Sequence, residues 1–187
     1  MYENEINKAL QTLNEEKILV YPTDTVWGLG CDATSEKAVS RIFEIKQRKE
    51  SKSLIILVDS IDMLRRYLSN IPENVLSYIG SLSNPTTVIY ENPNGLAKNV
   101  IANDNTVAIR WVQDDFCRDL IARFGKPIVS TSANISESPT PMRFKEIDTS
   151  ILDSVDYVVN LYREKVNTKP STIIKIGENG KLIVLRK

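Results

Sequence analysis

The sequence predicts one α/β domain over residues 1–187, built on a mixed, twisted, open sheet with flanking helices. Two patterns support this prediction. Apolar runs typical of strands alternate with segments of helical periodicity, and two strand-like runs near the end flank a Gly-Glu-Asn-Gly loop, which predicts a hairpin. The length of 187 residues is that of one ordinary domain. Because such sheets bind ligands at the carboxyl ends of strands, we expect the functional site there.

Periodicity and proline define the elements of the first third of the chain. Apolar residues at helical spacing predict an amphipathic helix over 3–15, and the apolar run at 18–22 predicts a buried strand that Pro22 stops. A polar, glycine-containing loop is expected to follow. A helix is predicted over 35–47, and the unbroken apolar run at 54–58 is typical of a strand covered on both faces.

The remaining elements follow from the same signals. Pro72 suits the first position of a helix, and Gly125 closes another. Further helices are predicted over 61–69, 73–82 and 114–124. Further strands are predicted over 86–91, 106–111, 128–133, 155–161, 171–176 and 181–186.

The composition excludes several classes of chemistry. Histidine is absent, which excludes Ser-His-Asp and Cys-His catalysis, histidine-ligated zinc and a histidine general base. Cys31 and Cys117 are the only cysteines, too few for an all-cysteine zinc site, and no protein metal site is predicted. The 24 basic residues balance the 24 acidic ones, so any basic site must be local.

The sequence also predicts a location. Charges recur at close intervals from the start, and no apolar run reaches ~18 residues, so neither a secretion signal nor a membrane span is predicted. Two cysteines without a signal peptide fit a reducing compartment. We therefore expect a cytoplasmic protein without membrane contact.

Two polar segments in the first third of the chain could carry chemistry. The loop 21–30 offers two hydroxyls and a carboxylate but is neither GxGxxG nor a Walker A motif, and its residue types alone favour a turn that caps a helix. The stretch 46–53 has four cations against one glutamate. Those cations could neutralise a triphosphate, although the residue types alone favour charge that stabilises a helix C-terminus.

Two further groups of polar residues lie at strands later in the chain. Residues 130–136 place four hydroxyls and an amide where a strand ends, either as a ligand site or as an ordinary strand-to-loop junction. Arg110 lies on a strand among apolar neighbours, so it needs an anion, which is either a protein carboxylate or a ligand. Ser171 and Arg186 would be ordinary surface residues if taken alone.

Six segments occur in a definite order along nearly the whole chain. They are YPTDTVWGLGCDA, IKQRKESKSL, TVAIR, STSANIS, PSTII and a terminal LR. Together they resemble the YrdC-like family of threonylcarbamoyl-AMP synthases, in its short single-domain bacterial form. The resemblance implies a YrdC-like (DHBP synthase-like) fold with a large, concave, locally basic cavity.

The resemblance also implies an activity. Such an enzyme is a nucleotidyltransferase that makes L-threonylcarbamoyladenylate and pyrophosphate from L-threonine, bicarbonate or CO2, and ATP. ATP is a substrate, and Mg²⁺ is expected to arrive bound to it. The expected partners are the small-molecule substrates and a tRNA-modifying transferase complex that accepts the adenylate, with weak RNA binding as a further expectation.

The resemblance assigns roles to individual residues. The expected catalytic residues are Lys46, Arg48 and Lys52. The expected ATP-binding residues are Arg48, Lys52, Thr106, Ser132, Asn134 and Arg186. The expected threonine-binding residues are Thr23, Thr25, Arg110, Ser130 and Ser171, with Arg110 pairing the substrate carboxylate.

Other functions are compatible with the same cavity. A YrdC-fold paralogue could bind RNA or a nucleotide without synthase activity, and a regulatory protein could sense ATP without turnover. An RNA complex led by phosphate contacts would weaken steeply with salt, whereas product analysis would identify a synthase.

Overall fold

The computed structural model describes residues 1–48, 54–166, 170–177 and 180–187. Its helices are α1 (Tyr2–Asn14), α2 (Glu36–Ile45), α3 (Ile61–Tyr67), α4 (Glu73–Ser81), α5 (Asp115–Phe124) and α6 (Thr149–Ser154), with 3-10 turns η1 (Lys98–Val100) and η2 (Phe144–Glu146). Its strands are β1 (Leu19–Tyr21), β2 (Gly28–Gly30), β3 (Ile55–Val58), β4 (Thr86–Glu91), β5 (Thr106–Trp111), β6 (Ile128–Ser132), β7 (Tyr157–Val158), β8 (Thr172–Ile176) and β9 (Leu182–Arg186).

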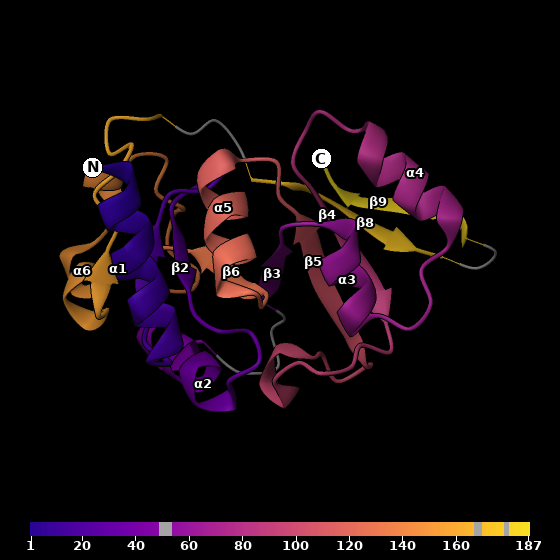
Figure 1. The fold of residues 1–187 in the computed structure, drawn as a ribbon, viewed down its shortest axis with the longest axis horizontal. Helices are drawn as coiled ribbons and strands as arrows, with labels where there is room; N and C mark the ends of the chain where they lie inside the picture. The colour runs from indigo at the N-terminus through magenta and orange to yellow at the C-terminus, as the bar shows by residue number, and fades with distance from the viewer. Residues whose placement is uncertain (49–53, 167–169, 178–179) are drawn as a thin grey trace.

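The strands of the described residues form one nine-stranded sheet in the order β7-β1-β2-β6-β3-β5-β4-β8-β9 (Figure 1). The sheet is mixed, because β3 pairs with β5 and β4 with β8 in parallel, whereas β8 and β9 are antiparallel. It is also open, with β7 at one edge and β9 at the other. The predicted fold class and the predicted pairing of the last two strands are confirmed.

The predicted element order lacked two elements, the strand β2 and the short helix α6. The expected loop after Pro22 contains β2, which pairs antiparallel with β1 on one side and β6 on the other. Glycines are depleted in strands, so the sequence Gly-Leu-Gly gave little strand signal. The structure explains Gly30: an added Cβ there would lie 2.5 Å from Tyr21 Cε1 and 3.0 Å from the Val129 carbonyl oxygen.

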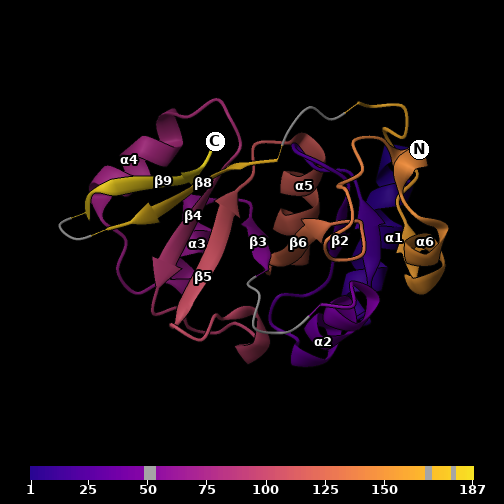
Figure 2. The same cartoon turned by 180° about the vertical axis from the view of Figure 1, so that it is seen from behind.

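Helices α3, α4 and α5 lie on one face of the sheet. They stand in front of the strands in Figure 1 and behind them in Figure 2. The Asp114 side chain caps α5 by accepting from the Cys117 amide, and Gly125 ends it at φ 75°. The buried face of α5 carries Phe116 and Leu120, and each such side chain contributes roughly 1.5–3 kcal/mol of burial free energy. The opposite face of the sheet lacks these three helices and carries the candidate site.

Candidate active site

A cavity of about 310 Å³ lies on the sheet face that α3, α4 and α5 leave open. Seven of the residues expected from the sequence line it: Thr25, Arg48, Arg110, Ser130, Ser132, Ser171 and Arg186. They come from six separate parts of the chain, so folding brings guanidinium and hydroxyl groups together. Aliphatic side chains of Ile55, Ile89 and Ile173 supply part of the wall.

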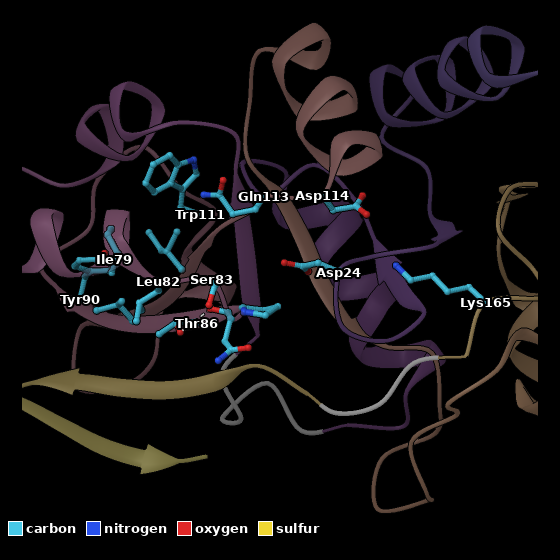
Figure 3. Close-up of a pocket in the computed structure, with 14 residues that line it drawn as sticks. Asp24, Ile79, Leu82, Ser83, Thr86, Tyr90, Trp111, Gln113, Asp114 and Lys165 are labelled. Atoms are coloured by element: carbon cyan, nitrogen blue, oxygen red, sulfur yellow. Dashed lines mark hydrogen bonds between the residues drawn. The ribbon is translucent and has the colours of Figure 1, made fainter.

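Strand alternation separates this cavity from another. On β5, Ala108 and Arg110 line the open-face cavity, whereas Ile109 and Trp111 line a second cavity on the helix-covered face (Figure 3). The alternation along β5 therefore puts Ala108 and Arg110 on the side of the first cavity.

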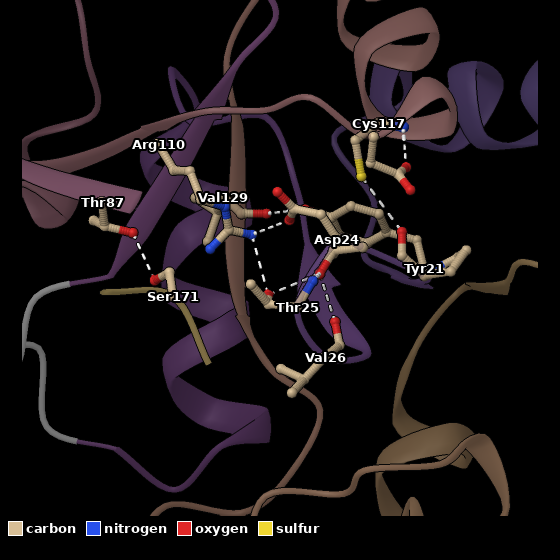
Figure 4. A network of polar contacts seen from close by, with 12 residues as sticks. Tyr21, Asp24, Thr25, Val26, Thr87, Arg110, Cys117, Val129 and Ser171 are labelled. Atoms are coloured by element: carbon tan, nitrogen blue, oxygen red, sulfur yellow. Dashed lines mark hydrogen bonds and ion pairs between the residues drawn. The ribbon is translucent and has the colours of Figure 1, made fainter. Parts of the chain in front are cut away.

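Arg110 is the most deeply buried guanidinium of the cavity, with 3% of its surface exposed. Its Nη2 lies 3.0 Å from Asp24 Oδ1 and donates to Thr25 Oγ1 at 3.3 Å (Figure 4). Its Nε makes no hydrogen bond among the described residues. Arg110 therefore has the protein carboxylate that its burial requires, and it keeps a donor for a further acceptor.

Asp24 was missed as a site residue. The sequence showed a carboxylate in this loop, but nothing in one sequence indicates that residues 24 and 110 meet. Burial raises the pKa of Asp24, and the neighbouring Arg110 charge opposes that rise. The ion pair fixes the position of the guanidinium within the cavity wall.

Thr23 shapes the loop and does not line the cavity. Its hydroxyl donates to the Val26 carbonyl at 2.7 Å and lies 3.0 Å from the Thr25 hydroxyl. It also accepts from the Thr25 amide at 3.0 Å. These bonds turn the chain so that Thr25 faces Arg110 (Figure 4).

Lys46 is almost fully buried, with 1% of its surface exposed, and it does not line the cavity. Its Nζ donates to the Ser132 carbonyl at 2.6 Å and to the Asn134 carbonyl and Oδ1 at 2.7 and 3.1 Å. The Lys46 carbonyl in turn accepts from the Ser136 amide at 2.9 Å. Burial and the neighbouring charge of Arg48 lower the pKa of Lys46 to about 7. Lys46 therefore holds the loop after β6 in place.

The Asn134 amide is used within this loop. Its Oδ1 accepts from the Ser132 hydroxyl at 2.6 Å, and its Nδ2 donates to the Ser138 carbonyl at 2.6 Å. The expected set of Lys46, Arg48, Ser132 and Asn134 thus comes together in space. Arg48 and Ser132 line the cavity, and Lys46 and Asn134 hold Ser132 through hydrogen bonds.

Arg186 clamps the segment that precedes β8. Its Nε and Nη2 donate to the Ser171 carbonyl at 3.1 and 2.8 Å, and the Ser171 hydroxyl lies 2.8 Å from that of Thr87. Burial and the charge of Arg110 lower the pKa of Arg186. Two guanidinium groups that repel each other across a cavity favour the binding of an anion between them.

Two expected residues are placed differently. Thr106 lies at the start of β5, outside the cavity lining, and donates to Asp104 Oδ1 at 2.7 Å. Lys52 lies outside the described residues. Across the described residues, no group of three or more His, Cys, Asp or Glu side chains is arranged to hold a metal ion, and no helix is long and apolar enough to cross a bilayer.

Comparisons with known proteins extend over almost the whole chain. A family model described as "Telomere recombination", covering Sua5, YciO and YrdC proteins, matches residues 11–187. A threonylcarbamoyl-AMP synthase of Pseudoalteromonas translucida is 34% identical over 185 residues, covering 96% of this chain and 97% of the relative. A protein of Methanocaldococcus jannaschii named as a putative threonylcarbamoyl-AMP synthase is 34% identical over 191 residues, covering 99% and 88%.

Solved structures agree with the fold. The crystal structure of P. abyssi Sua5 complexed with L-threonine superposes with a TM-score of 0.86 at 28% identity, covering 97% of this chain. This chain spans only 53% of that protein. E. coli YciO superposes with a TM-score of 0.85 at 21% identity, covering 100% of this chain and 90% of YciO. The family expected from the six motifs is confirmed: this chain belongs to the Sua5/YciO/YrdC family.

Proposed function

We propose that this protein is an L-threonylcarbamoyladenylate synthase, which uses L-threonine, bicarbonate or CO2, and ATP, and releases pyrophosphate. One observation carries the proposal: Arg48, Arg110 and Arg186 line a single cavity together with hydroxyl groups. The substrates carry matching anions, namely a carboxylate and a triphosphate. Relatives that match nearly the whole chain are named for this activity.

Arg110 is the proposed ligand of the threonine carboxylate. Its unpartnered Nε and the nearby hydroxyls of Thr25, Ser130 and Ser171 supply donors for an amino acid. The solved relative complexed with L-threonine supports an amino-acid site on this fold. Thr23 contributes by holding Thr25.

Arg48 is the proposed ligand of the ATP phosphates, together with Lys52. Arg48 lines the cavity, and its guanidinium can bind phosphate oxygens in pairs. Ser132 and Arg186 border the same space on the nucleotide side. Lys46, Thr106 and Asn134, whose polar groups already hold protein atoms, act by shaping the site.

The chemistry follows two steps. The threonine amine loses a proton to solvent and adds to the carbon of CO2, which gives a carbamate. A carbamate oxygen then attacks the α-phosphorus of ATP, the bond from that phosphorus to the bridging oxygen breaks, and pyrophosphate leaves. The sequence contains no histidine base, and formation of an adenylate at phosphorus depends mainly on positioning and charge neutralisation, which the arginine and hydroxyl groups of the cavity would supply.

The side chains that line the cavity determine which atoms would coordinate Mg²⁺. The described lining offers guanidinium and hydroxyl groups and no carboxylate, so Mg²⁺ would be held by ATP oxygens and water. The adenylate would then pass, in the cytoplasm, to a transferase complex that attaches the threonylcarbamoyl group to an adenosine of tRNA.

One incubation tests the proposal. The protein is mixed with ATP, L-threonine and labelled bicarbonate, and the products are separated and identified. We expect labelled threonylcarbamoyladenylate and an equal amount of pyrophosphate, with much less product from L-serine. ATP binding without labelled adenylate would refute the synthase and favour a nucleotide-binding paralogue.

A further inference from the structure

Thr87 is a fully buried polar residue beside the cavity of the candidate active site. It lies on β4, where its register partners are Arg110 on β5 and Ile173 on β8. Directly paired residues of neighbouring strands share one face of the sheet, and both partners line the cavity. Thr87 therefore lies on the cavity side of the sheet, although its side chain is 0% exposed and is not part of the lining.

The Thr87 hydroxyl has one polar contact in the described part of the chain. It lies 2.8 Å from the Ser171 hydroxyl (Figure 4). A buried hydroxyl proton without an acceptor is costly, and solvent does not reach Thr87. The Ser171 oxygen is the acceptor that remains for this proton. Thr87 therefore donates this hydrogen bond, and Ser171 accepts it.

Arg186 presents a second donor to the same oxygen. Its Nη2 lies 3.5 Å from Ser171 Oγ, while its Nε and Nη2 hold the Ser171 carbonyl at 3.1 and 2.8 Å. A guanidinium group has donors and no acceptor. The two lone pairs of the Ser171 hydroxyl thus face Thr87 on one side and Arg186 on the other. The Ser171 proton must be directed at a third group.

The described residues supply no third group. The hydroxyl of Ser171 contacts Thr87 and Arg186 alone among them. Ser171 lines the cavity, so an acceptor for its proton comes from a bound ligand. Arg110, the register partner of Thr87, lines the same cavity and holds an anion there in the proposed reaction. An anion bound by Arg110 is a strong acceptor for the Ser171 proton.

We propose that Thr87 is a positioning residue for the amino-acid substrate. By donating to Ser171, it leaves the Ser171 proton for the substrate carboxylate that Arg110 binds. Thr87 does not touch the substrate and acts through Ser171, whose hydroxyl it also polarises. This inference rests on the proposed function, since it takes the carboxylate to be that of L-threonine.

Thr87→Val tests the role of the hydroxyl, because valine keeps the shape of the side chain and lacks the proton. Ser171 then loses the donor that fixes its orientation. We expect the Kd for L-threonine to rise about tenfold by calorimetry, with the Kd for ATP unchanged. Thr86→Val is the matched control, since Thr86 faces the second cavity and its hydroxyl donates to the Asn84 carbonyl at 3.1 Å. It should bind L-threonine as the native chain does.

Thr87→Ser separates hydrogen bonding from packing. Serine keeps the hydroxyl and loses the methyl group, whereas valine does the opposite. A positioning role predicts near-native L-threonine affinity for Thr87→Ser and weak affinity for Thr87→Val. The reverse order would show that Thr87 contributes only packing, and it would overturn the proposal.

A double-mutant cycle tests whether Thr87 acts through Ser171. We expect Thr87→Val to add nothing to the loss of L-threonine affinity in Ser171→Ala, so the double variant should have the Kd of Ser171→Ala. Losses that multiply would show that the two residues act independently and would exclude this mechanism.

Steady-state kinetics provides a further readout. Thr87→Val should raise the KM for L-threonine and leave kcat and the KM for ATP within about twofold of the native values. An equal fall of kcat in Thr87→Val would contradict a role limited to substrate positioning. Absence of L-threonine binding by the native chain would refute the proposed function and this inference together. Equal L-threonine affinities of the native chain and Thr87→Val would refute this inference alone.

Discussion

Lys46 donates to both the carbonyl oxygen and the side-chain oxygen of Asn134, at 2.7 and 3.1 Å. The family resemblance implied a catalytic role for Lys46. In the structure, the buried Lys46 side chain joins the end of α2 to the end of β6 and the loop that follows it. The segments that carry Lys46 and Ser132 are therefore held together. The position of Ser132 in the cavity depends on this contact.

Lys46→Met should destabilise the protein and weaken ATP binding together. The substitution removes hydrogen bonds to charged nitrogen, each worth about 1.5–3 kcal/mol, and leaves buried carbonyls unpaired. We expect a loss of about 3 kcal/mol in the free energy of unfolding, measured by urea denaturation. Lys37→Met, on the exposed side of α2, is the control and should be neutral. Equal stabilities of the two variants would contradict this role.

The same lysine predicts a pH dependence of stability. Its pKa is about 7 in the folded chain against an ordinary 10.5, so between these values the unfolded chain binds a proton that the folded chain does not. The free energy of unfolding should therefore rise with pH above about 7, by up to about 1.4 kcal/mol per pH unit from this group. Urea denaturation from pH 7 to 9 should show this rise in the native protein and not in Lys46→Met.

Arg48→Ala should lose most synthase activity while the fold survives. Arg48 is half-buried in the cavity wall, and its charge is needed when phosphates are present. Removing one such group typically costs about 10²–10³ in rate, so pyrophosphate release should fall by that factor. Arg143→Ala, which loses only an exposed contact with Glu146, should keep full activity. Pyrophosphate release at the native rate would rule out this role for Arg48.

Arg110→Lys should weaken threonine binding selectively. Lysine keeps the charge opposite Asp24 but lacks the planar fork that binds a carboxylate at two points. We expect the Kd for L-threonine to rise about 10–100-fold by calorimetry, with little change in the Kd for ATP. Arg118→Lys, an exposed change on α5, is the control. A parallel loss of ATP affinity would instead indicate a general disturbance of the cavity.

Gly30→Ala should cost more stability than any other glycine-to-alanine change in the sheet centre. The new Cβ would lie 2.5 Å from the buried ring of Tyr21, and such overpacking costs about 1–3 kcal/mol. Gly28→Ala meets its nearest atom, Ser130 Oγ, at 3.2 Å and should cost less. Gly80→Ala, in α4 with its nearest contact at 3.8 Å, should stabilise the helix by up to about 1 kcal/mol. Thermal unfolding would give the stability of the three variants. If Gly30→Ala were the most stable of them, β2 would have to shift easily to accommodate the added methyl group.

The fold was predictable because its strands are apolar and its helices periodic. The alternation of TVAIRW put Arg110 on the strand face that lines the candidate cavity, and Gly125 ends α5 as expected. The strand β2 escaped prediction because its packing depends on the Tyr21 ring, which the local residues Gly28–Gly30 do not encode.

The sequence predicted part of the cavity lining but not the contacts that hold the lining residues in place. The motif order identified Arg48, Ser132 and Ser171, which line one cavity. The ion pair of Asp24 with Arg110 and the support of Asn134 by Lys46 join residues more than 80 positions apart. Contacts of this kind depend on strand order, which a single sequence does not specify.

The order of the strands in the sheet fixes the spacing between the backbones that carry the cavity-lining side chains. Ser130 on β6 and Arg110 on β5 are separated by β3, through Ile55, which pairs with Ser130 on one side and Ala108 on the other. With about 4.8 Å between neighbouring strands, the backbones that carry them lie roughly 10 Å apart whatever side chains they bear. New substrate preferences in this fold should therefore arise from side-chain length and loop conformation, since backbone spacing cannot be adjusted without breaking the strand pairing.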